Sequence, residues 1–285
     1  MISPYIALMK LRVVELLLVT TLPALFLAAD GVPPLGISLA TLLGGTLAAG
    51  AANAFNMIIE SDIDQLMDRT SKRPIVNKEV SENQAFAFAT ALTVLSLSIF
   101  WIFTNPLATA LTIGAITFYV FGYTVGLKRR TSQNIVWGGI AGCMPVLIGW
   151  AAVANSLNST AFLFFMVIFF WTPPHFWALA IKYKDDYEAA GIPMLPVVAP
   201  IAKVEQQMWF HTIAMFATSY LTLYSAALPA WSYIANTALT TFFAIQMFSL
   251  KSSQIEKSAA KIFHGSITYL SLYSILLVAA IFITF

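Results

Sequence analysis

Nine long apolar stretches dominate this chain, and they restrict its possible folds more than any other feature. They cover residues 13–29, 37–59, 85–103, 107–127, 135–154, 160–181, 208–228, 231–250 and 265–285. A helix needs about 20 apolar residues to cross a bilayer, so each stretch is long enough to span. Only 10% of the residues are charged, whereas a soluble domain carries about 25%.

Backbone groups inside a bilayer must be paired within the chain, so we expect the nine stretches to be helices. Together they leave no room for a separate soluble domain. The sequence therefore predicts an all-α integral membrane protein with nine transmembrane helices, forming a single domain over residues 1–285.

The 15 basic residues all lie before the first stretch or in alternate connections, and therefore on one side of the membrane. Under the positive-inside rule, the N-terminus is expected in the cytoplasm and the C-terminus outside. Lys128, Arg129 and Arg130 are most simply explained as part of this topological signal, and the alternative is that they bind anionic groups such as haem propionates or diphosphate. The first residues resemble neither a signal peptide nor a transit peptide, which favours a bacterial-type cytoplasmic (inner) membrane. The bilayer is the expected partner, and no feature indicates nucleic-acid binding.

Polar residues recur every four positions from the end of the second stretch. They are Asn56, Glu60, Asp64 and Asp68, and the bases Arg69, Lys72 and Arg73 follow. In one continuous helix, positions four apart form a stripe. Carboxylates are ligands for Mg²⁺, which is often shared with substrate phosphates, and Arg and Lys donate to phosphate oxygens. The stripe predicts a magnesium–diphosphate site.

The insertion cost of charges places this site at the membrane surface. A carboxylate at the bilayer centre costs about 2.5–3.5 kcal/mol, so several together must lie in a water-accessible mouth. A second long polar connection, IKYKDDYEAAGIPMLP from Ile181, follows the sixth stretch and reaches the same face. Two acidic cytoplasmic loops facing one bundle suggest a clamp on one diphosphate. Breaking the carbon–oxygen bond then leaves charge that metal and bases stabilise, and an allylic cation needs a dry apolar pocket.

Two segments resemble a known family. The Asn56, Glu60, Asp64 spacing is similar to the Asn-x-x-x-Asp-x-x-x-Asp signature of UbiA-type intramembrane prenyltransferases, with Glu60 where Asp is usual. The stretch WTPPHFWALAIKYKDDYEAAGIPMLPVV, from Trp171 to Val198, resembles the haem-farnesylating branch of that family rather than the branch acting on quinone precursors. The resemblance covers essentially the whole chain.

The resemblance implies a Mg²⁺-dependent enzyme with farnesyl diphosphate and haem B as substrates. The farnesyl group would join a haem vinyl group, and water would complete the new substituent. Haem A synthase or the oxidase assembly machinery would be partners.

The resemblance also assigns roles to residues. Catalysis falls to Asn56, Glu60, Asp64 and Asp186; metal binding to Asn56, Glu60, Asp64, Asp68, Asp185 and Asp186; and substrate binding to Arg69, Lys72, Arg73, Lys184, Tyr187 and His175. The usual Asp-x-x-x-Asp of the second loop is broken, since Ala189 stands four residues after Asp185. His175 follows two prolines inside the sixth stretch, where it could bind a freed carbonyl or approach the haem.

Three other functions fit parts of the pattern. A prenyltransferase for an aromatic quinone precursor shares the first motif, but the second segment argues against it. A cation-coupled transporter would carry isolated charges near the bilayer midplane, whereas these acids cluster at one mouth. A non-catalytic haem chaperone would need histidine ligands but not the acid stripe.

Overall fold

The computed structural model describes residues 3–251 and 254–284, and this part of the chain contains helices and no strands. The first half comprises α1 (Ser3–Met9), α2 (Leu11–Ala29), α3 (Leu35–Ile59), α4 (Ser61–Asp64), α5 (Glu82–Phe103), α6 (Pro106–Thr117) and the π-helix η1 (Phe118–Leu127). The second half comprises α7 (Asn134–Ala154), α8 (Ser159–Lys182), α9 (Lys184–Ala189), α10 (Leu195–Val198), α11 (Ile201–Ser225), α12 (Ala230–Phe248), the 3₁₀-helix η2 (Ser249–Lys251) and α13 (Ile255–Phe282). The predicted all-α class is confirmed.

Seven helices in the described ranges are long and apolar enough to cross a membrane: α2, α3, α5, α6 with η1, α7, α8 and α13. Helices α11 and α12 lie in the same bundle, packed on α8 and α13 respectively, but do not reach the same apolar composition. The count of nine transmembrane helices therefore remains a prediction.

Most predicted spans begin and end within three residues of a helix boundary, and two helices begin well before the predicted spans. Helix α11 begins at Ile201 instead of residue 208, and α13 begins at Ile255 instead of residue 265. The first turns of both helices carry charged residues, among them Lys203 and Lys257. Hydropathy marks where a helix enters an apolar environment, so it misses helical turns that extend beyond it.

The four-residue polar stripe does not lie on one continuous helix. Helix α3 ends at Ile59, and Glu60 links it to the single turn α4. The Glu60 amide donates to Asn56 O at 3.0 Å and the Asp64 amide to Glu60 O at 2.9 Å, so helical pairing persists as far as Asp64. The Thr70 hydroxyl then donates to Asp64 O at 2.9 Å and closes the turn. Asp68 lies beyond this point and is exposed, so its predicted place on the stripe is wrong.

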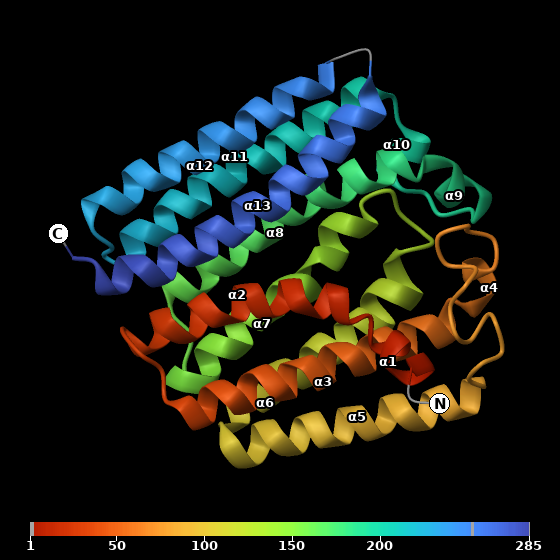
Figure 1. Cartoon of the computed structure of the whole chain (residues 1–285), viewed down its shortest axis with the longest axis horizontal. Helices are drawn as coiled ribbons and strands as arrows, with labels where there is room; N and C mark the ends of the chain where they lie inside the picture. Colours follow the sequence, from red (N-terminus) through yellow and green to blue (C-terminus); the bar gives the residue numbers. More distant parts are fainter. Residues whose placement is uncertain (1–2, 252–253, 285) are drawn as a thin grey trace.

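Helix α8 lies in the middle of the bundle, against α7, α11 and α13, while α3 packs mainly on α5 (Figure 1). The short helices α4, α9 and α10 gather at the end of the bundle where the N-terminus lies, and the C-terminus lies at the opposite end. This arrangement brings the loops after α3 and α8 together, as the sequence predicts.

Candidate active site

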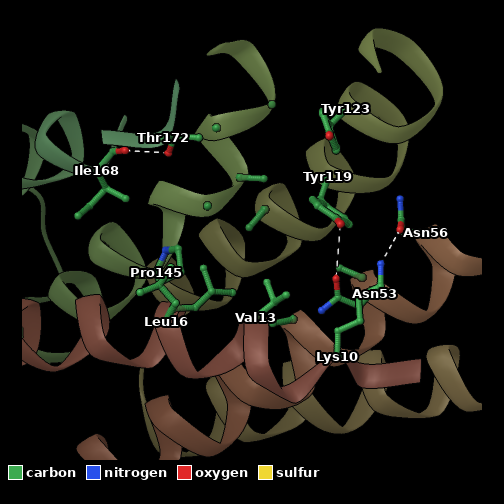
Figure 2. Close-up of a pocket in the computed structure, with 18 of the residues that line it drawn as sticks. Lys10, Val13, Leu16, Asn53, Asn56, Tyr119, Tyr123, Pro145, Ile168 and Thr172 are labelled. Atoms are coloured by element: carbon green, nitrogen blue, oxygen red, sulfur yellow. Dashed lines mark hydrogen bonds between the residues drawn. The ribbon is translucent and has the colours of Figure 1, made fainter. Parts of the chain in front are cut away.

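A cavity of about 330 Å³ opens among α2, α3, α6, η1, α7 and α8. Its charged end is lined by Lys10, Glu60, Arg69, Arg73 and Lys128, and the rest is mostly apolar. Figure 2 shows Lys10, Asn53, Asn56 and Tyr119 pointing toward one another, with Leu16, Pro145 and Ile168 farther along. A cavity that is charged at one end and apolar along the rest suits a ligand with a charged head and an apolar tail.

Asn56 sits 2% exposed near the end of α3, and both ends of its amide are bound. Lys10 Nζ donates to Asn56 Oδ1 at 2.8 Å, and Asn56 Nδ2 donates to Thr124 Oγ1 at 3.1 Å. One turn earlier, Asn53 donates to Met9 O at 2.9 Å and accepts from the Tyr119 hydroxyl at 3.4 Å. These bonds fix the N-terminal segment and η1 to α3.

Two buried carboxylates follow Asn56, and each is paired with a cation. Lys128 Nζ lies 2.6 Å from the Glu60 carboxylate, which is 1% exposed. Arg73 Nη1 lies 2.5 Å from Asp64 Oδ2. Buried ion pairs of this kind are costly to leave half-formed, so each carboxylate needs its cation when nothing else is bound.

The surroundings of Lys10 and Lys128 disfavour the charged form of both side chains. Burial lowers the pKa of Lys10 well below its usual range, with repulsion from Arg73 adding to the shift. Burial also lowers the pKa of Lys128, and the Glu60 carboxylate opposes that shift. An arriving anion would stabilise the charged form of both groups.

The π-helix η1 explains why Lys128 reaches this cavity. In an α-helix, Lys128 would lie about half a turn out of phase with Tyr119. A π-helix pairs residue i with i+5 and has about 4.4 residues per turn, so the same separation makes about two full turns. The Lys128 amide donates to Tyr123 O at 2.9 Å in this pattern. Tyr119 and Lys128 therefore face the same side.

Arg69 connects the two polar loops. Its amide donates to Asp186 Oδ2 at 3.3 Å, and its Nη2 donates to the Tyr187 hydroxyl at 3.4 Å. Its guanidinium also lies 5.6 Å from the centre of the Tyr183 ring and 5.9 Å from that of Tyr187. Arg69 and Tyr187 line the cavity, so α9 contributes to its charged end.

Other predicted site residues lie outside the cavity lining. Asp68 and Lys72 are exposed on the loop after α4, and Lys184 and Asp185 are exposed in the first turn of α9. Asp64 and Asp186 are less exposed but do not line the cavity either. His175 is 5% exposed, bonds Ser266 Oγ through Nδ1 at 2.7 Å, and stacks between Trp171 and Phe263. It therefore packs α8 against α13, and neither a carbonyl bond nor contact with the cavity is found for it.

The sequence assigns no site role to Lys10, Tyr119 or Tyr123, although all three line the cavity. For Lys128 it favours topology over the alternative of anion binding, because a basic residue beside an apolar stretch is ordinary. Lys128 lies beside Arg129, which binds exposed Asp62 at 2.7 and 2.8 Å, and only the fold separates their roles. The π-helix turns Lys128 toward the cavity, and a search for α-helical periodicity of 3.6 residues cannot detect this change of register.

Within the described residues, no three His, Cys, Asp or Glu side chains group as a metal cluster. The predicted six-residue metal set is therefore not brought together. The oxygens of Asn56, Glu60 and Asp64 are nonetheless hard donors on consecutive turns, and Glu60 Oε1 has no partner besides Lys128. These three fit a divalent cation if their lysine and arginine partners turn to an anion.

A close contact in the cavity wall supplies a stability test. A Cβ added at Gly138 would lie 2.2 Å from Tyr123 Cδ2, so the ring must move. We expect Gly138→Ala to destabilise the protein by about 1–3 kcal/mol, as overpacking does. The measurement is the thermal midpoint in detergent. Gly114→Ala, where a Cβ meets nothing within 4 Å, is the control and should not lower the midpoint. Equal midpoints for both variants would contradict the expectation.

The chain is similar to known proteins over nearly its whole length. The model of the UbiA prenyltransferase family matches residues 17–282. A protoheme IX farnesyltransferase of Renibacterium salmoninarum is 50% identical over 274 residues, covering 94% of this chain and 86% of that protein. One of Kineococcus radiotolerans is 48% identical over 290 residues, covering 95% and 86%.

Solved structures share the fold at low sequence identity. A digeranylgeranylglyceryl phosphate synthase superposes with a TM-score of 0.80 at 15% identity, covering 98% of each chain. The apo UbiA homologue of Aeropyrum pernix K1 gives 0.74 at 19%, covering 95% of this chain and 97% of its own. A UbiA homologue of Archaeoglobus fulgidus, bound to GPP and Mg²⁺, gives 0.70 at 15%, covering 97% and 99%.

Proposed function

Because this chain belongs to the UbiA prenyltransferase family, we propose that it transfers a farnesyl group from farnesyl diphosphate to a vinyl group of haem B, with addition of water and release of diphosphate, giving haem O. The observation that carries the proposal is one cavity with a cation- and carboxylate-lined end and an apolar remainder. The choice of haem B as acceptor rests on the relatives that are about 50% identical over nearly the whole chain.

The residues at the charged end have separate tasks in this proposal. Asn56, Glu60 and Asp64 would hold a divalent cation. Lys10, Arg69, Arg73 and Lys128 would bind the diphosphate and stabilise the charge that develops as the carbon–oxygen bond breaks. A bound Mg²⁺ would add Lewis-acid stabilisation of the leaving diphosphate.

The apolar remainder of the cavity would protect the allylic cation from water. Tyr119 and Tyr123 lie between the charged end and the apolar part, with ring centres 5.7 Å apart. Their faces could stabilise positive charge on the farnesyl carbon. Asp186 would act indirectly, by holding Arg69 through its backbone amide.

The exposed bases Lys72 and Lys184 would attract the diphosphate to the mouth, and the exposed acids Asp68 and Asp185 would attract the divalent cation. His175 would hold α8 against α13. We place the charged end on the cytoplasmic side of a bacterial inner membrane, following the distribution of basic residues. Haem A synthase or the oxidase assembly machinery would take up the product.

The test is an assay of purified protein with haem B, farnesyl diphosphate and Mg²⁺. Haems would be extracted and their masses measured, beside a sample with EDTA. We expect a new haem with the mass of hydroxyethylfarnesyl addition, lost with EDTA and restored by excess Mg²⁺. Unchanged haem B from folded protein would contradict the proposal, and prenylation of an aromatic quinone precursor instead would assign the other branch. A product that forms equally in EDTA would contradict the metal role.

A further inference from the structure

Glycines on two helices shape the apolar part of the cavity. Gly45 of α3 and Gly138, Gly139 and Gly142 of α7 line it. A Cβ at Gly138 would meet Tyr123, and one at Gly139 would lie 3.0 Å from Thr172 Cγ2, so neighbouring side chains already occupy those positions. At Gly45 and Gly142 a Cβ meets nothing within 4 Å. Only these two lining glycines face open space.

Both positions lie well beyond the charged end. Gly45 is about 16 Å from Asn56 along α3, at 1.5 Å per residue. Gly142 is about 10 Å along α7 from Ile135, which packs with Tyr187 near the charged end. A chain anchored there by its diphosphate would pass Gly142 first and Gly45 later.

The shape of the cavity indicates which substrate passes these glycines. Lining residues on α3 extend from Glu60 to Thr41, about 28 Å along the helix. The cavity, of about 330 Å³, is therefore extended along α3. A flexible prenyl chain with its diphosphate at the charged end can follow this length.

We propose that Gly45 and Gly142 determine the length of prenyl chain that the enzyme accepts. A farnesyl chain anchored at the charged end would pass Gly142 first and lie with its last isoprene unit beside Gly45. This inference rests on the proposed function and deepens it.

The test compares geranyl and farnesyl diphosphate at equal concentration, with haem B and Mg²⁺. We expect Gly45→Leu to shift the ratio of geranylated to farnesylated haem by at least about tenfold, because even one methylene in an apolar pocket changes selectivity by this amount. Gly142→Leu, nearer the charged end, should weaken use of both diphosphates. Gly45→Ala should shift the ratio less and fold at least as well, since alanine favours helix.

Gly114→Leu is the matched control. Gly114 lies on α6, is exposed, has open space around it and does not line the cavity, so the product ratio should not change. An unchanged ratio in Gly45→Leu, or the same shift in the control, would overturn the proposal.

A second measurement separates this proposal from the proposed function. Titration calorimetry with Mg²⁺ and no haem gives the affinities for the two diphosphates directly. A shift of at least about tenfold in their ratio for Gly45→Leu is expected even if haem is not the acceptor. If the wild-type protein produces no farnesylated haem, only the proposal of haem B as acceptor is refuted. If Gly45→Leu leaves the ratio of the two affinities unchanged, the chain-length role is refuted.

Discussion

Glu60→Gln is expected to lower farnesyl transfer by about 10²–10³-fold, the loss seen when one preorganised charge-stabilising group is removed. The carboxylate is 1% exposed and 2.6 Å from Lys128, so the substitution removes a proposed metal ligand and the counter-charge of a buried lysine together. Burial lowers the pKa of Lys128 and the Glu60 carboxylate opposes that shift, so without the carboxylate the pKa should fall further. The measurement is kcat for haem farnesylation, with the thermal midpoint as a check on folding.

Asp62→Asn is the matched control for this variant. Asp62 lies two residues away and also binds a base, Arg129, but its side chain is 61% exposed. Exposed ion pairs contribute about 0–1 kcal/mol, so activity should stay within about twofold of wild type. A folded Glu60→Gln protein as active as Asp62→Asn would exclude Glu60 from the chemistry.

The second large effect is expected for Lys128→Gln, which should lower kcat/KM for farnesyl diphosphate by about 10²-fold. Lys128 is half-buried at the charged end of the cavity, where it would bind diphosphate oxygens during bond breaking. The measurement varies farnesyl diphosphate and haem B separately. The KM for haem B should change little, because the proposed contact is with the diphosphate.

Two further variants sharpen the Lys128 test. Arg130→Gln removes an exposed charge from the same connection and should leave kcat/KM within about twofold. The double variant Glu60→Gln with Lys128→Gln should lose little more than the worse single variant, because groups in direct contact act as a unit. Fully additive losses, or equal losses in Lys128→Gln and Arg130→Gln, would contradict the assignment.

Hydropathy predicted the all-helical fold, because the bilayer imposes simple rules on the length and helicity of the segments within it. The four-residue spacing matches the backbone pairing from Asn56 through Glu60 to Asp64, of which Asn56 and Glu60 line the cavity. It failed at Asp68, where a side-chain bond from Thr70 ends the helical turn. Such local competition between side chain and backbone has no periodic signature.

The partners of the acids could not be predicted from spacing. Lys10 and Lys128 approach α3 from distant parts of the chain, and Lys10 does so through a left-handed backbone conformation, with φ 51°, between α1 and α2. His175 shows the opposite error, since a buried histidine beside two prolines suggested a ligand site. Its bond to Ser266 satisfies it within the helix packing.

The π-helix also affects how this region can vary among related chains. In an α-helix, two side chains share a face when they are seven positions apart. In η1, Tyr119 and Lys128 share a face at a separation of nine. Evolution can therefore absorb a two-residue insertion or deletion here by changing helix type, while both groups stay in the cavity. Equivalent lysines in homologues would then be found by superposition, whereas an ungapped alignment would pair the wrong residues.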